Sequence, residues 1–295
     1  MFMAKRIFLF MAVNLLIMVT LSVVLSLFGV TGYLTAQGID YRQLMVFCLV
    51  WGFGGAFISL ALSRVMAKWM MGVTVIEPEE SDPELRWLMS TVHQMARQAE
   101  LPAMPEVGWY QSREVNAFAT GATRGRALVA VSSGLLERMN RDQVAGVLGH
   151  EVAHIANGDM VTMTLIQGVI NAFVMFIARA IAYAVSANVR EESRFMVHFM
   201  VTIVLEIALS VLGMIVVAAF SRAREYRADR GGAQLAGKER MIEALRGLQR
   251  TVALVENQEH ASIATLKISG KSGKFAALFA THPPLESRIR ALQGG

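Results

Sequence analysis

Four long apolar runs constrain the fold of this chain more than any other feature. They cover residues 7–28, 44–62, 160–187 and 195–220. A helix needs about 20 mostly apolar residues to cross a bilayer. Of the 295 residues, 54% are hydrophobic and 17% are charged, whereas about a quarter of the residues in soluble domains are charged. We therefore expect a mostly α-helical membrane protein with about four transmembrane helices.

The first two runs predict an amino-terminal transmembrane hairpin over residues 1–68. Lys5 and Arg6 precede the hairpin, and Arg64 and Lys68 follow its second run. The positive-inside rule then places both ends, including the amino terminus, in the cytoplasm. A cleaved signal peptide is the alternative for the first run, but the run is long for one and no clear cleavage site follows it.

The other two runs predict a second transmembrane helix pair over residues 160–220. They contain two charged residues, Arg179 and Glu206. Unpaired charges are costly inside a bilayer, so we expect these side chains to approach each other or to face a cavity. A hairpin that packs in a soluble domain without crossing the bilayer is the alternative.

The polar segments 69–159 and 221–295 predict the two parts of a cytoplasmic domain that contains both helices and strands. Short strand candidates, separated by polar or glycine-containing turns, lie at residues 107–111, 115–120 and 127–132. They come just before the most informative motif of the chain and predict a small β-sheet beside it. An edge strand of that sheet could hold an extended peptide by β-addition.

That motif is His-Glu-x-x-His, formed by His150, Glu151 and His154. Asn140 and Gln143 predict a capped helix start shortly before it, so both histidines should lie on one face of a helix. Two imidazoles at positions i and i+4 can bind one zinc ion, and the adjacent Glu can act as a general base. Two solvated histidines on a surface helix are the alternative.

A catalytic zinc site needs a third protein ligand. Cys48 is the only cysteine and lies in an apolar run, so the other histidines and the acids are the candidates. Glu225 and Asp229 are also i and i+4, and one of them can bind zinc while the other orients a histidine ligand. A solvated helix face with i,i+4 charge pairs is the alternative.

The order of these motifs resembles the HtpX family of membrane zinc metalloproteases, relatives of the CAAX prenyl endopeptidases. The likeness rests on His-Glu-x-x-His-x-x-Asn-Gly-Asp, two apolar segments, Glu-x-x-x-Asp and a late Thr-His-Pro-Pro, and it covers essentially the whole chain. The resemblance implies a gluzincin-type, zincin-like metalloprotease domain with one zinc ion per chain. It makes His150, His154 and Glu225 the zinc ligands, Glu151 the general base, and Asp229 a residue behind the ligands.

Three further positions follow from the resemblance. Asn116 would contact the peptide backbone of a substrate, and His282 would donate a hydrogen bond to the developing oxyanion. Arg288 would orient His282. For His282, a capping or turn residue before two prolines is the alternative.

The resemblance also implies a function: a zinc metalloendopeptidase of the bacterial inner membrane that acts in stress response and membrane protein quality control. Its catalytic domain would face the cytoplasm, and its partners would be membrane-protein substrates and other quality-control proteases. A membrane adaptor with a structural zinc ion is the alternative, but such a site has no use for Glu151. A transporter is less consistent with four spans and a large polar portion. The net charge of +5 comes without basic runs interleaved with aromatics, so we expect no nucleic-acid binding.

Overall fold

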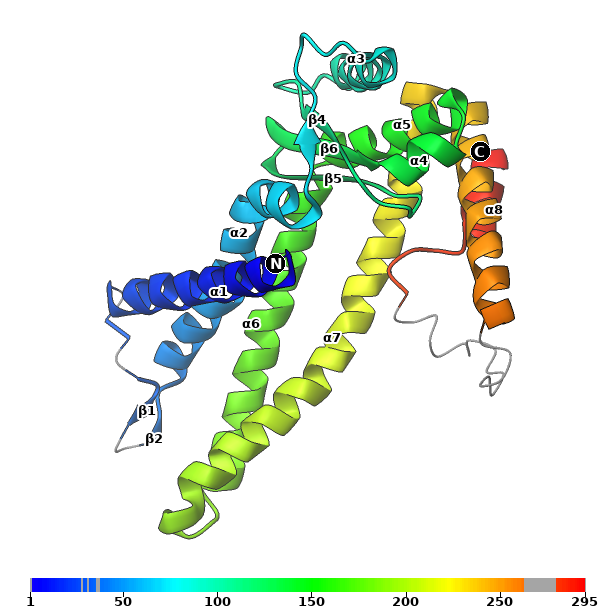
Figure 1. Cartoon of the computed structure of the whole chain (residues 1–295). Helices are drawn as coiled ribbons and strands as arrows, with labels where there is room; N and C mark the ends of the chain where they lie inside the picture. Colours follow the sequence, from blue (N-terminus) through cyan, green and yellow to red (C-terminus); the bar gives the residue numbers. More distant parts are fainter. Residues whose placement is uncertain (1, 28, 31, 36–37, 263–279, 295) are drawn as a thin grey trace. The chain divides into compact units, whose positions relative to one another are not determined.

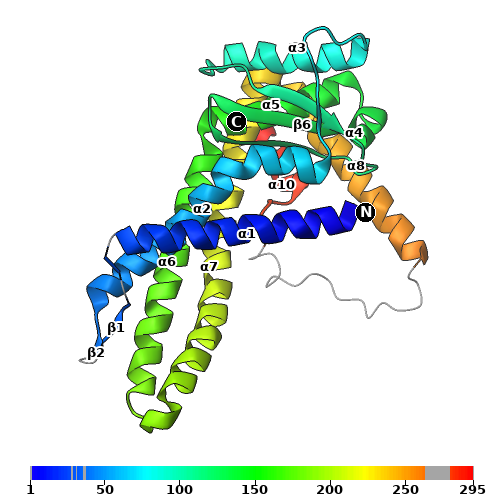
Figure 2. The ribbon, with the colours of Figure 1, turned by 60° about the vertical axis from the view of Figure 1, so that its left-hand side comes forward.

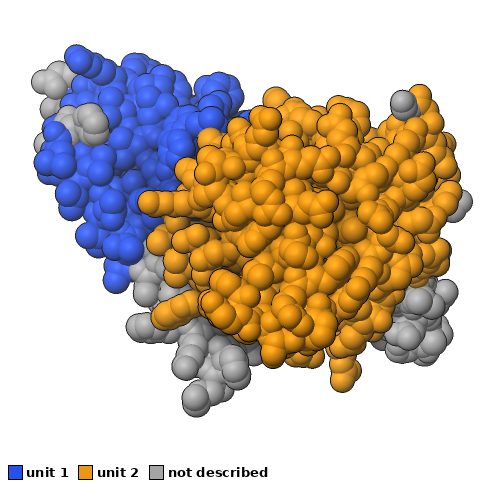
Figure 3. Space-filling view, turned by 90° about the horizontal axis from the view of Figure 1, so that it is seen from above, with its two compact units in different colours: residues 1–60, 162–217 blue, residues 61–161, 218–295 orange. Residues whose placement is uncertain are grey.

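The structure is a computed structural model that describes residues 2–27, 29–30, 32–35, 38–262 and 280–294 (Figure 1). For residues 2–14 and 252–262 it describes the backbone alone. The described chain forms two compact units, each built from two separate stretches (Figure 3). Unit 1 comprises residues 1–60 and 162–217, and unit 2 comprises residues 61–161 and 218–295.

Unit 1 is built from apolar helices. In the described part of the chain, three helices are long and apolar enough to cross a membrane: α2 (Tyr41–Met71), α6 (Asp159–Ser186) and the first part of α7 (Glu191–Ala236). Helix α1 (Phe2–Leu27) adds a shorter apolar stretch over Leu15–Leu27. This arrangement confirms the predicted mostly helical membrane protein. Figure 2 shows α6 and α7 as an antiparallel pair joined by a short turn.

Small residues let the helices of unit 1 approach closely. A Cβ at Gly52 of α2 would lie 2.6 Å from the backbone nitrogen of Ala172 in α6. A Cβ at Gly54 would lie 2.3 Å from the Leu21 side chain of α1, whereas one at Gly55 would meet none of the described atoms within 4 Å. Two of the three glycines in this part of α2 therefore serve helix contact, as is common in membrane helices.

The expected meeting of Arg179 and Glu206 is confirmed. Arg179 of α6 donates a hydrogen bond to the Glu206 carboxylate of α7, and also to the backbone carbonyl oxygen of Met175. Between α1 and α2 the chain forms a small hairpin of two strands, β1 (Leu34–Thr35) and β2 (Gly38–Ile39).

Unit 2 contains a four-stranded sheet, counted over the described residues, with the strand order β3-β4-β6-β5. Its strands are β3 (Thr74–Val75), β4 (Glu106–Tyr110), β5 (Ala117–Thr123) and β6 (Arg126–Ser132). Strand β6 is parallel to β4 and antiparallel to β5. Strand β5 therefore lies at the edge of the sheet, and the three strands predicted from sequence are all present.

The central strand β6 is buried on both faces, because its alternate side chains enter two different apolar clusters. Val129 and Val131 pack in the main core with helices of unit 2, whereas Leu128 and Ala130 pack with Val73 on the other face. A nearly continuous apolar sequence is typical of such a strand.

The helices of unit 2 are α3 (Pro83–Gln98), α4 (Ser133–Arg138), α5 (Arg141–Asn157), α8 (Lys238–Ser262) and α10 (Leu285–Gln293), together with the end of α7. The main core joins α3, α5 and the sheet. Helix α5 also packs closely on α8, since a Cβ at Gly146 would lie 2.4 Å from the carbonyl oxygen of Arg240. The helix that carries the motif is thus held from several sides.

Candidate metal centre

Helix α5 places both motif histidines in the interior. The predicted capping box is present: Asn140 accepts a hydrogen bond from the Gln143 amide, and the Gln143 side chain accepts one from the Asn140 amide. One turn apart, the rings of His150 and His154 meet edge to face with centroids 4.5 Å apart. Their Nε2 atoms are 3.0 Å apart, and both side chains are buried.

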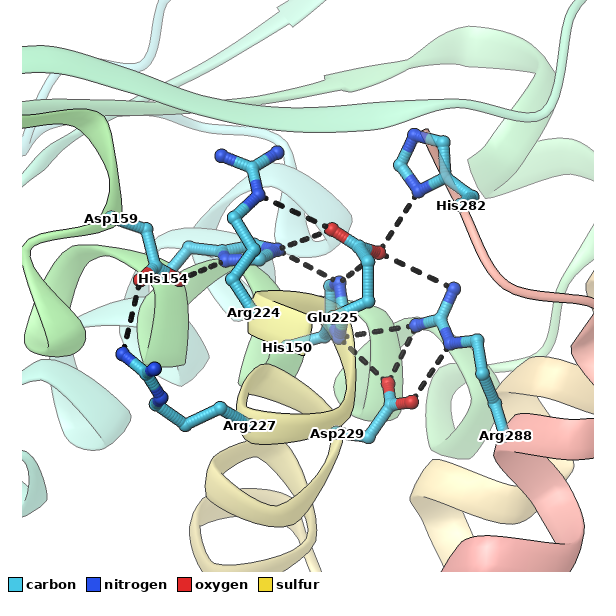
Figure 4. Close-up of polar contacts among 9 residues, drawn as sticks. All are labelled: His150, His154, Asp159, Arg224, Glu225, Arg227, Asp229, His282 and Arg288. Carbon is cyan, nitrogen blue, oxygen red and sulfur yellow. Dashed lines mark hydrogen bonds and ion pairs between the residues drawn. The ribbon is translucent and has the colours of Figure 1, made fainter. Parts of the chain in front are cut away.

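Helix α7 brings Glu225 to the same point (Figure 4). Its Oε2 lies 3.5 Å from Nε2 of His150, and its Oε1 lies 3.4 Å from Nε2 of His154. One candidate ligand atom of each residue lies within 4.8 Å of the other two. Glu225 is 1% exposed, so a carboxylate is held in the interior against two imidazoles.

The outer nitrogen of each imidazole is held by a carboxylate. Nδ1 of His154 lies 2.6 Å from Oδ2 of Asp159, and Nδ1 of His150 lies 3.0 Å from Oδ1 of Asp229. When each Nδ1–H donates to its carboxylate, the lone pair of each Nε2 points inward. Such partners fix the tautomer and orientation of metal-binding histidines.

The inward-facing atoms of His150, His154 and Glu225 suit a bound cation. Two inward lone pairs 3.0 Å apart repel each other unless a positive charge lies between them. The Oε1 atom of Glu225 is buried without a hydrogen bond among the described residues, and a cation would satisfy it. Two nitrogen ligands and one carboxylate oxygen form a metal-binding triad.

Arg288 of α10 fixes the carboxylates behind the triad. Its Nε and Nη2 atoms donate to Oδ2 and Oδ1 of Asp229, at 2.8 and 2.5 Å. Its Nη1 lies 3.5 Å from Oε2 of Glu225. A bidentate pair of this kind orients the carboxylate as well as neutralising it, so Asp229 is held toward His150.

The charges of the metal-free site follow from these contacts. Burial lowers the pKa of His154, but the hydrogen bond to Asp159 and the nearby carboxylate of Glu225 outweigh it and raise that pKa to about 9. Burial raises the pKa of Glu225, but the hydrogen bonds from His150, His154 and His282 bring it well below its usual range. Without a metal, the site therefore retains protons on its histidines and a charged Glu225.

A cavity of about 170 Å³ lies beside the triad, and the other residues that the sequence predicts for the active site line it. Glu151, Asn116 and His282 line it together with His150 and Glu225. Its other walls are mostly apolar: Val115, Leu135, Val147, Met241, Ala244, Leu245 and Leu248. The site thus combines a metal-binding triad, a carboxylate and an apolar recess.

His282 and Arg288 both approach the carboxylate of Glu225. His282 is exposed, and its Nδ1 lies 2.9 Å from Oε2 of Glu225. Arg288 meets the same oxygen at 3.5 Å, but its hydrogen bonds go to Asp229. Both residues therefore act on the carboxylate of Glu225, and the expected contact between them is not among the interactions of the described residues.

Sequence reasoning gave no role to Asp159. Gly158 ends α5 in the left-handed conformation, with φ 67°, and the chain then starts α6 at Asp159. This turn brings the Asp159 carboxylate back to His154. The signal was present in the Asn-Gly-Asp that closes the motif, because glycine favours a left-handed helix end.

Known proteins that resemble this chain are proteases, as the metal-binding triad suggests. Residues 83–295 match the model of "Peptidase family M48". The chain is 56% identical to "Protease HtpX homolog" of Bacillus licheniformis and 53% identical to that of Bacillus subtilis, each over 99% of both chains. It is 50% identical to "Protease HtpX" of Thioalkalivibrio sulfidiphilus over 98% of both chains.

A solved structure shares the fold. The structure titled "Crystal Structure of S. mikatae Ste24p" is similar with a TM-score of 0.65 and 20% sequence identity. The similarity covers 98% of this chain but 64% of that one. This likeness concerns the fold, and the Ste24p chain is substantially longer.

Proposed function

This chain belongs to peptidase family M48, and from that membership we propose a zinc-dependent endopeptidase that cleaves misfolded or damaged membrane proteins at the cytoplasmic face of the bacterial inner membrane. The family and the metal-binding triad make it a membrane metallopeptidase. The observation that supports a zinc-dependent endopeptidase is the buried set of His150, His154 and Glu225 with Glu151 at an adjoining cavity.

Zinc fits the ligand types. Imidazole nitrogen and carboxylate oxygen are both common zinc ligands, and three protein ligands leave one position open, as in catalytic zinc sites. A zinc ion held there would polarise the scissile carbonyl and lower the pKa of its water toward neutrality. His150, His154 and Glu225 are the residues that would hold it.

Glu151 is the proposed general base. It follows the first ligand directly and lines the cavity from the same helix. Its carboxylate would take a proton from the attacking water and pass it to the leaving amine nitrogen. The neighbouring Asp159 and Asp229 are occupied by the histidines, so they are less suited to this task.

The edge strand β5 provides a place for the substrate backbone. It pairs with β6 on one side, and in the described part of the chain no strand pairs with its other side. Asn116 and Ala117, at its start, line the cavity with Glu151. A peptide added along β5 would therefore pass close to the base, and Asn116 could bond its backbone.

His282 is the proposed oxyanion donor. It lines the cavity and is exposed enough to meet a substrate. Its present acceptor, Glu225, also belongs to the metal-binding triad. A donor aimed at the developing oxyanion stabilises the transition state more than the substrate.

The proposed substrates and location follow from the two apolar helices that are joined directly to the metal-binding site. Helix α6 starts at Asp159, directly behind the ligands, and α7 returns to Glu225. Arg64 and Lys68 at the end of α2, with Arg227 in α7, favour a cytoplasmic position for the catalytic domain by the positive-inside rule. A peptidase so joined to apolar helices would meet substrates in or at the bilayer.

The test compares metal-free, zinc-restored and Glu151→Gln samples of the detergent-purified full chain on an unfolded model protein, with metal content measured on each. Zinc should restore cleavage, and Glu151→Gln should retain zinc but lose cleavage. Glu137→Gln is the matched control, because Glu137 is an exposed residue of α4. Cleavage by the Glu151 variant at the normal rate would overturn the role of this residue.

The quality-control role needs a second comparison in liposomes. A membrane protein and a destabilised variant of the same sequence length serve as substrates. Faster cleavage of the destabilised form, from the side that carries the catalytic domain, supports the proposal. Equal cleavage of both forms contradicts it, and bound zinc without any cleavage favours the adaptor alternative.

A further inference from the structure

Unit 1 contains a cavity of about 710 Å³ that is separate from the metal centre. The hairpin β1–β2, the last turns of α6 and the first turns of α7 line it. It therefore lies near the α6–α7 turn, at the other end of α6 from Asp159. A volume of this size is typical of sites for small molecules.

Polar atoms in the cavity lack partners. Oγ1 of Thr202 is buried without a hydrogen bond among the described residues, and both ring nitrogens of His198 are buried, with the Ala182 backbone as a polar group beside them. Nε of Arg179 is also buried without a hydrogen bond in the described part of the chain, although the other end of its guanidinium bonds Glu206. All three residues line the cavity. An unsatisfied polar group costs several kcal/mol in hydrocarbon, so these atoms indicate a polar occupant.

The charges of the lining cancel. Arg179 pairs with Glu206 inside the cavity. Arg194 and Glu191 lie one turn apart at the start of α7, are exposed and line its mouth. The occupant therefore faces one cation and one anion beyond the internal pair, which matches a ligand with one charge of each sign.

The hairpin closes one side of the cavity through a close contact. A Cβ at Gly38 would lie 2.6 Å from the Tyr183 hydroxyl oxygen of α6, and Gly38 has φ 126°. A side chain is excluded there both by space and by backbone conformation. On the α7 side, Phe195 and Phe199 stack with centroids 6.5 Å apart and are largely exposed.

We propose that this cavity binds the headgroup of a zwitterionic phospholipid that carries a primary ammonium. The phosphodiester oxygens accept hydrogen bonds from Arg179, His198 and Thr202. The ammonium donates to Glu191, and the acyl chains lie along the exposed rings of Phe195 and Phe199. A phosphodiester needs donors, and these buried polar atoms supply them.

Native mass spectrometry tests the proposal on the detergent-purified full chain. The protein is equilibrated with phosphatidylethanolamine, phosphatidylcholine or phosphatidylglycerol. The three lipids separate the contributions of the primary ammonium, of a quaternary ammonium without N–H donors, and of net negative charge. Retention of phosphatidylethanolamine above both others is expected.

The double variant His198→Phe, Thr202→Val removes two of the three donors, keeps side chains of similar shape and leaves the Arg179–Glu206 pair intact. It should bind phosphatidylethanolamine about tenfold more weakly, the size expected for two lost hydrogen bonds. Ser210→Ala is the matched control, since Ser210 is an exposed hydroxyl residue of α7 that does not line the cavity.

Each outcome decides the proposal. Unchanged retention in the double variant overturns the site, provided its zinc content and elution volume match those of the unmodified chain. Stronger retention of phosphatidylglycerol, or equal retention of all three lipids, overturns the zwitterionic ligand. If the double variant does not fold, Glu191→Gln provides the second test and should abolish the preference for phosphatidylethanolamine over phosphatidylcholine.

Discussion

Asp159 accepts a hydrogen bond from Nδ1 of His154 over 2.6 Å, across the left-handed turn that separates α5 from α6. The contact holds the imidazole so that Nε2 faces Glu225. It also links the first residue of an apolar helix to the metal-binding triad. The outer partner of this ligand is thus supplied by the next element of the chain.

The first prediction concerns this contact. Asp159→Asn should weaken zinc binding by roughly 10–100-fold, because outer partners of histidine ligands contribute that much to metal affinity. Competition with a chromophoric chelator measures it. Asp142→Asn is the control at the other end of α5, where the carboxylate pairs with Arg240 at the surface. Equal affinities in both variants would show that the Asp159 contact is dispensable.

The second prediction concerns the buried pair of Arg288 and Asp229. Arg288→Met keeps much of the side-chain volume but leaves a buried carboxylate without its cation. Breaking such a pair costs about 3–5 kcal/mol, so the melting temperature of the purified protein should fall clearly.

Arg141→Met is the comparison for this prediction. Arg141 also forms a close ion pair, with Glu84 at 2.7 Å, but both side chains are substantially exposed. Water and salt screen exposed pairs, so its loss should lower the melting temperature far less. A similar fall in both variants would argue against a special role for burial at Arg288.

The third prediction is that zinc binding releases protons. In the metal-free protein the pKa of His154 is raised from 6.5 to about 9, so this residue is protonated at neutral pH and must lose its proton to bind a metal. Apparent zinc affinity should therefore rise with pH from 6.5 toward 9. Glu225, whose pKa is lowered, contributes no proton.

Calorimetric titration of zinc into the Glu151→Gln variant measures this release. The apparent binding enthalpy at pH 7 should change with the ionisation enthalpy of the buffer. Enthalpies that are the same in all buffers would mean that the histidines are already neutral.

The fourth prediction concerns the contact between α5 and α8. Gly146→Ala would place a Cβ 2.4 Å from the carbonyl oxygen of Arg240. The helices must move apart, and overpacking of this kind costs about 1–3 kcal/mol. Thermal unfolding measures it. Gly55→Ala is the helical control, because a Cβ there meets no atom of the described residues within 4 Å. Destabilisation by both variants would mean that glycine itself is needed.

Much of this fold could be predicted because its elements carry local signals. Asn140 and Gln143 mark the start of α5, and the structure has that capping box. Long apolar runs identify the membrane helices. Strands β1, β2 and β3 could not be predicted, because each has two residues and two residues show no alternation.

The sequence predicted which residues form the site, but it predicted fewer of the contacts between them. Spacing places Glu225 and Asp229 on one helix face, and only the resemblance chose between them. The structure shows Glu225 at both Nε2 atoms and Asp229 at the outer nitrogen of His150. The position of Arg288, between Asp229 and Glu225, depends on how α10 packs, and no local pattern encodes that.

The order of the ligands along the chain has a consequence for biosynthesis. His150 and His154 are made early, whereas Glu225 is made only after all of α6 and most of α7. Arg288, which orients the carboxylates, follows both helices in the chain. A nascent chain therefore cannot assemble the full metal site until both apolar helices have been synthesised.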